Sequence, residues 1–361
     1  MCSSIGNLRH AATGFAALLF MHSMAGVGIC EELNLENSPA PVANKADEPF
    51  AKAYSLDHAV RFLDTASLDW TKNRKCFTCH TNFSYLMVRP AIDASVQAHR
   101  DVRNSLQTMV TSRWESDGPR WDAEVVMAAS VLAINDAMTT GKLHPITRKA
   151  LDRMWTVQAA NGGFDWIKCG WPPMESDDHY GVTIALIGLG MAPENYIDTS
   201  QAQQGLAGLK KYLKNNPAPT LHHQAMVLWA SNYHSDLLTQ AEKKSTISRI
   251  TARQNTDGGW ALAGLGDWQR SDKKEQDTKT SDGYATGFLI YALSLSGLPK
   301  EDPVIKNGIA WLKSHQRASG RWHTRSLNRD NKHFISHAGT AFAVLALVNS
   351  DPEAKPKLNS K

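Results

Sequence analysis

A repeated turn is the feature of this sequence that most restricts the folds it can adopt. The segments MWTVQAANGGFDW (154–166), ITARQNTDGGWAL (250–262) and WLKSHQRASGRWH (311–323) each place a glutamine four residues before a glycine and six before an aromatic residue. A helical pattern of apolar residues precedes each turn. Self-similarity of this kind is typical of architectures built from repeated supersecondary units. The chain is therefore expected to consist of repeated helical units.

A second, more apolar segment follows each turn, and weaker copies of the same pair fill the rest of the chain. The first segments alternate apolar and charged residues with a helical period, as half-exposed helices do. The second segments are almost uncharged, which indicates helices buried on most sides. They span 83–92, 121–134, 177–190, 221–231, 281–297 and 336–348. Six outer and six inner helices predict an all-α fold, an (α/α)6 toroid over residues 51–350, with a linear helical solenoid as the alternative.

The N-terminal segment has the features of an export signal. Residues 1–25 contain a weakly basic start, a short apolar run and small residues at a cleavage position, which predicts a signal peptide and a secreted or periplasmic protein. Residues 26–50 are polar and predict a flexible leader, and residues 351–361 predict a polar tail. No later segment reaches the length of a membrane span. The net charge of +4, with both signs mixed, does not favour nucleic acid as a partner.

The run Cys76-Phe77-Thr78-Cys79-His80 has the C-x-x-C-H spacing that attaches a c-type haem. Cys76 and Cys79 would bind the haem vinyl groups, and the imidazole of His80 would reach the iron. Haem attachment of this kind takes place outside the cytoplasm, in agreement with the predicted signal peptide. A disulfide and a metal clip at the same residues are the alternatives.

The Gln-x3-Gly-x-aromatic turns resemble the QW repeats of squalene–hopene cyclases and the matching repeats of protein prenyltransferase β subunits. The resemblance covers roughly residues 50–350 and implies an α/α toroid that binds an apolar, isoprenoid-like substrate in a central cavity. The chain looks like a secreted, single-domain relative of that superfamily. The glutamine, glycine and aromatic residues of the turns are interpreted as structural, because the amide can bridge one helix end to the next and the glycine suits a left-handed turn.

In such a ring the inner helices run in the same direction, so that their N-termini share one rim around the cavity mouth. Most residues that can carry chemistry lie at this rim: Cys76, Cys79, His80, Glu175, Asp177, Asp178, His179, Tyr180, His222, His223, Asp282, Tyr284 and His337. The aspartates are explained as well by helix capping. A charged histidine is unfavourable at a helix N-terminus, so the rim histidines are expected to be neutral ligands or bases.

The segment ESDDHYG (175–181) resembles the D-x-D-D catalytic motif of the cyclases in spacing and in its place before an inner helix. Glu175, Asp177 and Asp178 take the three acidic positions. The resemblance implies that Asp177 is the acid that protonates an alkene, with the neighbouring carboxylates raising its pKa. His179 stands where the cyclases have threonine and is a competing base.

The segments SDGYATG (281–287) and ISHAGT (335–340) resemble the zinc-binding positions of prenyltransferase β subunits. Asp282 and His337 match the expected ligands, but Tyr284 stands where those enzymes have a cysteine. A tetrahedral zinc site without its thiolate lacks a ligand, so zinc is not expected here.

Three functions remain open from the sequence. The first is a cyclase-like protein with an apolar substrate and Asp177 as acid. The second is a haem-dependent redox or sensor protein, for which a redox partner is expected. The third is a polysaccharide-active or non-catalytic binding toroid, because helical toroids host several chemistries.

Overall fold

Helices in consecutive outer and inner pairs make up this all-α chain. The computed structural model describes residues 32–74 and 76–351, so the predicted signal peptide and most of the predicted tail lie outside the described residues. The outer helices are α1 (Leu56–Arg74), α3 (Gln97–Thr108), α6 (Pro145–Thr156), α8 (Ser200–Asn215), α10 (Gln240–Thr251) and α12 (Pro303–His315). The inner helices are α2 (Ser84–Val88), α5 (Asp122–Thr139), α7 (Asp178–Met191), α9 (Leu221–Ala230), α11 (Gly283–Leu295) and α13 (Ile335–Ser350).

Short helical turns complete the pairs. A π-helix, η1 (Cys79–Phe83), leads directly into α2, and a second one, η3 (Met109–Arg113), joins α3 to the short α4 (Trp114–Ser116). Three 3-10 turns are η2 (Arg89–Ala91), η4 (Tyr196–Asp198) and η5 (Leu262–Leu265). In the described ranges no β-strand forms, only isolated bridges. Nor does any described helix combine the length and apolarity needed to cross a bilayer.

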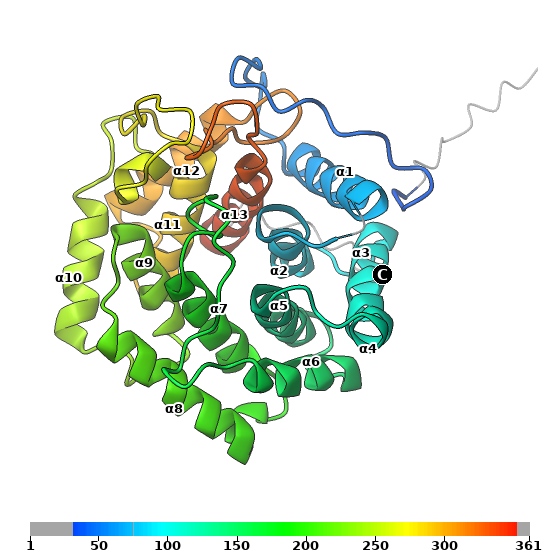
Figure 1. The fold of residues 1–361 in the computed structure, drawn as a ribbon. Helices are drawn as coiled ribbons and strands as arrows, with labels where there is room; N and C mark the ends of the chain where they lie inside the picture. Colours follow the sequence, from blue (N-terminus) through cyan, green and yellow to red (C-terminus); the bar gives the residue numbers. More distant parts are fainter. Residues whose placement is uncertain (1–31, 75, 352–361) are drawn as a thin grey trace, which may run out of the picture. The chain divides into compact units, whose positions relative to one another are not determined.

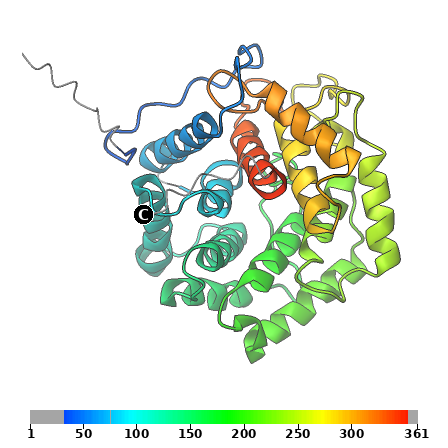
Figure 2. The same cartoon turned by 180° about the vertical axis from the view of Figure 1, so that it is seen from behind.

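The inner helices close into a ring. Each contacts the next in the order α2, α5, α7, α9, α11 and α13, and α13 contacts α2 again. Figure 1 shows this inner ring with the outer helices around it, and Figure 2 shows the same arrangement from behind. The contact between the first and last inner helices rules out a linear solenoid. The predicted all-α toroid is therefore confirmed.

Burial separates the two rings as the sequence pattern predicts. In α7 every residue from His179 to Leu189 is buried. In the outer helix α8 the buried residues are Ala202, Gly205, Leu206, Leu209 and Tyr212. These positions form a single helical stripe that faces the inner ring. The uncharged composition of the inner helices thus reflects contacts on several sides.

The repeated turns, which we call the seams (158–164, 254–260 and 316–322), bridge neighbouring pairs. The side-chain amide of Gln316 donates to the carbonyl of Gly320 at 2.9 Å and to that of Ser55, just before α1, at 2.8 Å. The side-chain amide of Gln158 likewise donates to the carbonyls of Gly162 and Gly205. That of Gln254 donates to the carbonyls of Gly258 and Val304. These hydrogen bonds confirm the structural role of the glutamines, and the bond from Gln316 closes the ring.

The described part of the predicted leader is not flexible. Residues 32–50 lie along the toroid as an extended strap that backbone and side-chain bonds hold in place. The guanidinium of the fully buried Arg321 donates to the carbonyls of Val42 and Ala43, at 3.0 and 2.7 Å. The amide of Ala318 donates to Pro49 O at 2.9 Å. The polar composition of the strap therefore reflects partners on the last repeat, which corrects the flexible leader expected from the sequence.

Candidate functional site

The rim is formed by the loops that precede the inner helices and by the first turns of those helices. Hydrogen bonds join neighbouring inner helices here. The Asp177 carboxylate, at the start of α7, lies 3.0 Å from Nε2 of His223 on α9. The Thr81 hydroxyl, in η1, lies 3.0 Å from Nδ1 of His337 on α13. The rim therefore brings most of the candidate residues into one layer, although their individual roles differ from those expected.

Asp177 is the N-cap of α7. Its carboxylate accepts the backbone N–H of His179 at 3.1 Å and that of Tyr180 at 3.4 Å, and it lies 3.0 Å from Nε2 of His223. Burial alone would raise the pKa of Asp177, but the hydrogen bond and charge of His223 and further donors lower it to about 2. The carboxyl group is thus ionised at neutral pH. This geometry corrects the predicted acid role of Asp177, because a proton donor must hold its proton.

The other two carboxyl groups of the acidic motif have separate environments. Asp178 forms an ion pair with Lys168 at 2.9 Å. Glu175 lies in the loop before α7, where its backbone bridges to Trp171, and burial raises the pKa of its side chain to about 7. Glu175 therefore holds a proton close to neutral pH.

Three buried histidines lie at the start of α7 and α9. The rings of His179 and His223 are 5.1 Å apart, and Nε2 of His222 lies 3.0 Å from the hydroxyl of Tyr284 on α11. Burial lowers the pKa of His179 to about 4 and that of His222 well below its usual range. Both are neutral at physiological pH, in line with the expectation for the rim. Within the described residues neither ring nitrogen of His179 has a hydrogen-bond partner.

The residues at the predicted zinc positions have other partners. The Asp282 carboxylate caps α11 through the N–H of Ala285 at 3.0 Å and accepts from the hydroxyl of Thr324 at 3.1 Å. His337 uses Nδ1 on Thr81. In the described ranges no group of His, Cys, Asp and Glu is arranged to hold a metal ion.

The imidazole of His80 is held by a short relay. Its Nδ1 lies 3.1 Å from the hydroxyl of Thr81, which in turn lies 3.0 Å from Nδ1 of His337. The ring stacks on Phe334 and meets the edge of Trp70. Burial lowers the pKa of His80 to about 4, so its ring is neutral. No described residue bonds its Nε2, which leaves a ligand-competent nitrogen with a fixed ring orientation.

His80 and Cys76 line one cavity of about 290 Å³. Its other lining residues are Trp70, Arg74, Thr78, Trp171, Pro172, Met174, Glu175, Ser326, Lys332, Phe334 and Ile335. The indole N–H of Trp70 is buried without an acceptor, which is a sign that the cavity suits a ligand. Cys79 is outside this lining: it is 5% exposed, and burial raises its thiol pKa. His80, Cys76 and Met174 offer haem-binding groups at this cavity, but Cys79 would have to turn toward it, and the cavity, which is smaller than a haem, would have to widen.

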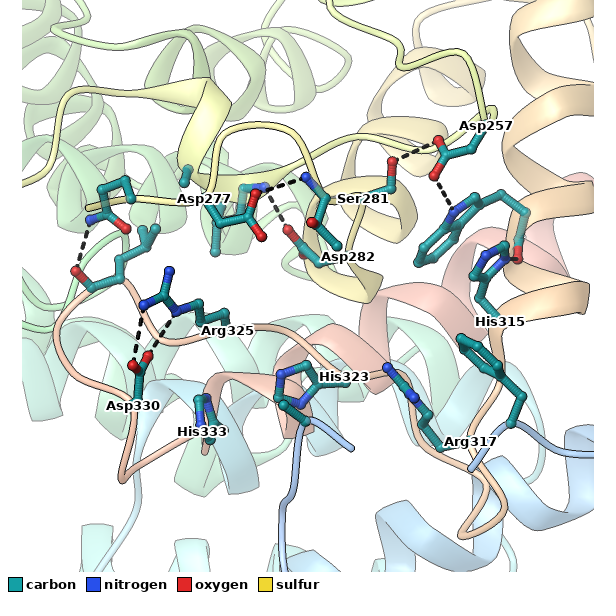
Figure 3. A pocket seen from close by; sticks show the side chains of 18 residues that line it. Asp257, Asp277, Ser281, Asp282, His315, Arg317, His323, Arg325, Asp330 and His333 are labelled. Carbon is teal, nitrogen blue, oxygen red and sulfur yellow. Dashed lines mark hydrogen bonds and ion pairs between the residues drawn. The ribbon is translucent and has the colours of Figure 1, made fainter. Parts of the chain in front are cut away.

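A second cavity, of about 600 Å³, lies between the long loops before α11 and α13 and is charged (Figure 3). We call it the charged groove. Three of its carboxylates, Asp257, Asp277 and Asp282, have no ion-pair partner in the described part of the chain, whereas Asp330 pairs with Arg325 at 2.7 Å. Burial raises the pKa of Asp282 to about 6. The predicted apolar cavity mouth therefore carries several charged side chains on this side, among apolar ones.

The opposite end of the charged groove is aromatic. Phe50, from the strap, is 52% exposed and meets the edge of His315, which stacks on Trp311 with ring centroids 4.4 Å apart. The Arg317 guanidinium lies over the Phe50 ring at 4.3 Å. A ligand in this groove would meet hydrogen-bonding groups at one end and exposed ring faces at the other.

Sequence reasoning named only Asp282 among the residues of this groove. Most of the missed residues lie in the loops 262–281 and 323–333, which carry no repeat signal, and the others come from the strap, the turn at Asp257, the end of α12 and Arg317. The one available signal was composition, because His323, Arg325, Asp330 and His333 follow one another closely in a loop that is otherwise polar and short of apolar residues.

Comparisons with known proteins do not indicate a function for this chain. No protein-family model matches the chain, and no curated protein sequence matches it. Among solved structures the chain is similar to ent-copalyl diphosphate synthase from Streptomyces platensis, with 14% identity and a TM-score of 0.49 over 74% of this chain and 50% of that one, so it spans about half the synthase. It is also similar to a polysaccharide lyase, with 13% identity and a TM-score of 0.30 over 86% of this chain and 80% of that one. Function must therefore come from the side chains of this protein.

Proposed function

We propose that the protein is an exported c-type haem protein built on an α/α toroid, with a redox or sensory role. Cys76 and Cys79 would attach the haem, and His80 would bind the iron. The observation that carries this proposal is the pairing of a neutral, oriented imidazole with a cavity that Cys76 also lines. A bound haem would supply one-electron chemistry at the rim, and a redox partner would approach from this side.

The surroundings of His80 have the features of a ligand environment. Histidines that bind metals use their second ring nitrogen on a hydroxyl, carbonyl or carboxylate, which fixes the tautomer. Here Thr81 fills that role for Nδ1, and His337 holds Thr81 in turn. Met174 lines the same cavity and is a suitable second ligand, because a thioether with an imidazole is a common haem pair. Arg74 and Lys332 supply positive charge for the haem carboxylates.

Cys79 is the residue that must move. It is the first residue of the π-helix η1, and it is buried outside the lining of the cavity. A π-helical turn holds one more residue than an α-helical turn, and such turns occur often at functional sites. Conversion of this turn to α-helix would rotate the preceding side chains by roughly 100°. We therefore expect attachment to be coupled to a change in η1.

The test is the intact mass of protein exported from a host that matures c-type cytochromes. We expect one covalent haem, roughly 0.6 kDa, that survives denaturation. A Cys76→Ala, Cys79→Ala double variant should lose this mass. Cys169→Ala is the matched control, because Cys169 is a free and exposed cysteine outside the motif, and it should keep the mass. An unmodified mass for the wild-type protein contradicts the proposal. A disulfide or a metal clip would then be the remaining interpretation of the motif.

A visible spectrum separates attachment from iron ligation. His80→Ala should keep the covalent mass, since both thiols remain, and should change the spectrum because the iron loses a ligand. Thr81→Val should retain the haem and shift its reduction potential, because the imidazole loses the partner that orients it. An unchanged spectrum in His80→Ala excludes His80 as the ligand.

A second candidate function rests on the charged groove. Its exposed Phe50 ring and its hydrogen-bonding groups suit a sugar, which presents apolar ring faces and hydroxyl groups together. Among the described residues that line the groove, carboxylates without an ion-pair partner outnumber cationic side chains without one. This excess of negative charge favours a neutral oligosaccharide over an anionic one. The groove thus supports the polysaccharide-binding alternative, and it leaves the haem proposal unaffected.

Calorimetric titration with cellohexaose and with a hexamer of galacturonate tests this second candidate. The neutral sugar should bind, and Phe50→Ala should weaken binding about three- to tenfold, because it removes the ring face. Val42→Ala is the control, because Val42 is an equally exposed apolar residue of the strap outside the groove. Tighter binding of the anionic hexamer, or no effect of Phe50→Ala, contradicts the assignment.

A further inference from the structure

A third cavity, of about 680 Å³, lies on the outer side of the ring between α8 and α10, with α9 behind it. We call it the lateral cleft. Its lining consists of His179, Lys210, Leu213, Lys214, Pro217, Ala218, Gln224, Val227, Asp236, Leu237, Leu238, Glu242 and Thr246. Its size falls within the roughly 300–1,000 Å³ of small-molecule sites. Neither the haem proposal nor the charged groove uses any of these residues.

His179 is the feature of this cleft that points to a ligand. Its side chain is buried, with 4% of the residue exposed, yet both ring nitrogens lack a hydrogen-bond partner. A buried polar group without a partner is destabilising, and a histidine with both ring nitrogens unpaired calls for an explanation such as a ligand. Because His179 is part of the lining, a ligand in the cleft can supply the missing partner.

The rest of the lining combines apolar side chains with polar and charged ones, including the carboxylate of Glu242 in the first turn of α10. Leu213, Val227, Leu237 and Leu238 provide hydrocarbon surface from α8, α9 and the loop before α10. Lys210 forms an ion pair with Asp236 at 2.7 Å. Lys214, one helical turn further along α8, has no ion-pair partner in the described part of the chain. One end of the cleft therefore carries an uncompensated positive charge.

Chain direction places this charge beside the unpaired histidine. Lys214 lies near the C-terminal end of α8, which leads through Pro217 and Ala218 to the start of α9 at the rim. His179 lies in the first turn of α7, at the same rim. Lys210, Asp236 and Leu237 lie toward the other end of the helices. Lys214 and the unpaired His179 thus lie at the rim end, and the other end has the apolar Leu237 and Leu238 beside the Lys210–Asp236 ion pair and Glu242.

We infer that the lateral cleft binds a single-chain amphiphile with an anionic head group, such as a fatty acid. The head group would meet Lys214 and His179, and the hydrocarbon chain would lie against Leu213, Val227 and Leu238. This site is separate from the haem cavity, so its occupation does not depend on haem attachment.

Titration of the exported protein with octanoate, decanoate and dodecanoate tests the inference. Affinity should rise about three- to fourfold for each added methylene, because each one is removed from water. Dodecanol, which has the same chain without the charge, should bind more weakly than dodecanoate. An affinity that does not depend on chain length, or dodecanol binding as tightly as dodecanoate, overturns the inference.

Three variants locate the site. Leu238→Trp fills the cleft at a half-buried position and should weaken dodecanoate binding at least tenfold. Lys214→Ala should weaken it two- to fivefold, the range of an exposed ion pair. Lys211→Ala is the matched control on α8, because Lys211 is exposed and outside the lining, and it should bind as the wild type does.

Thermal unfolding in the absence of ligand checks that each variant is folded. If Leu238→Trp fails to fold, Lys214→Ala against Lys211→Ala still decides the question, since both changes are on an exposed helix surface. Equal losses in these two lysine variants indicate a non-specific charge effect and contradict a site in the lateral cleft. Dodecanoate-dependent change in oligomeric state would likewise contradict it, because it would assign the apolar surface to a second copy of the chain.

Discussion

The seams and the rim of this toroid satisfy their polar groups in different ways. In the seams each glutamine amide is paired: Gln316 bonds Gly320 and Ser55, and its side-chain oxygen accepts the N–H of Ser55 at 2.8 Å. In the rim, both nitrogens of His179 and one nitrogen each of His222 and His323 are buried without partners. The seam glutamines thus complete their amide hydrogen bonds within the protein, although Ser319 Oγ and Arg321 Nε of the last seam are buried without a partner in the described chain, and the rim histidines leave several nitrogens for a ligand.

Electrostatics shows the same difference between the two regions. Burial lowers the pKa of His80 and His179 to about 4 and raises that of Glu175 to about 7. Groups with such shifts gather at sites that bind or react. The seams consist mainly of turn residues and packed aromatic side chains. Arg317 and Arg321 of the last seam are exceptions, because burial lowers the pKa of both. We therefore expect seam variants to act on stability and rim variants to act on ligands.

The largest effect is expected at a seam glycine. Gly320 has a φ of +94°, and a Cβ there would lie 2.2 Å from the carbonyl oxygen of His58. Gly320→Ala should therefore lower the free energy of unfolding by about 4 kcal/mol or more, from backbone strain and a clash with main chain. Urea unfolding followed by circular dichroism measures this loss.

Gly297→Ala is the matched control for that experiment. Gly297 has a φ of +93°, but nothing lies within 4 Å of the position its Cβ would take. The control should cost only about 1–2 kcal/mol from the strained backbone. An equal loss of unfolding free energy in the two variants would show that the close contact of the seam with α1 does not contribute to stability. It would contradict the expectation that seam variants act on stability.

The seam glutamines should have the next largest effect. Gln316→Ala removes three hydrogen bonds at a buried position and should cost about 2–3 kcal/mol, at roughly 1 kcal/mol for each bond. Gln203→Ala on α8, an exposed glutamine whose amide bonds one carbonyl, should change stability by less than about 0.5 kcal/mol. Similar values for both would argue against a special role of the seam amide.

At the rim, Asp177→Ala should cost about 1–2 kcal/mol at neutral pH, because α7 loses its cap. The folded-state pKa of Asp177 is lowered to about 2 from an ordinary value of 3.8. Its contribution is therefore present above pH 4 and is lost as the pH falls toward 2. Asp177→Asn should cost less, because asparagine also caps helices. A difference between wild type and Asp177→Ala that does not depend on pH would contradict the lowered pKa.

Glu175→Gln should have the smallest effect, and of the opposite sign. The pKa of Glu175 is raised from 4.5 to about 7, so between these values the folded state holds a proton that the unfolded state has lost. The contribution of Glu175 to the stability of the wild-type protein therefore decreases as the pH rises from 4.5 to about 7. The variant should therefore match the wild type near pH 5 and be about 1 kcal/mol more stable at pH 8, a value reduced for partial exposure. Equal stability of the two proteins at both pH values would contradict the raised pKa and would indicate that the Glu175 side chain is exposed to solvent.

The fold could be predicted from the sequence because the seams repeat locally. Gln316, Gly320 and Trp322 carry their structural meaning in their spacing, and the uncharged inner segments indicate burial. The strap could not be predicted in the same way. Its polar residues 32–50 look like a free leader until the buried Arg321, far along the chain, is seen to donate to Val42 and Ala43.

The position of the candidate site could be predicted from the sequence, but the chemical roles of its residues could be predicted less well. The common direction of the inner helices brings the rim residues together, as expected. The state of Asp177, however, depends on His223, a residue 46 positions away. The charged groove and the lateral cleft depend on loop paths and on a space between α8 and α10, which no repeat pattern encodes.

Native-state hydrogen exchange tests the distinction between seam and rim most directly. Seam amides such as those of Gly162, Gly258 and Gly320, each bonded within its turn, should exchange only through global unfolding. Amides of the rim loops 166–176 and 267–281 should exchange with a lower opening free energy, and their protection should rise when haem or another ligand is bound. Rim loops as well protected as the seams in the ligand-free protein would contradict this account, because the rim would then belong to the same cooperative unit as the fold.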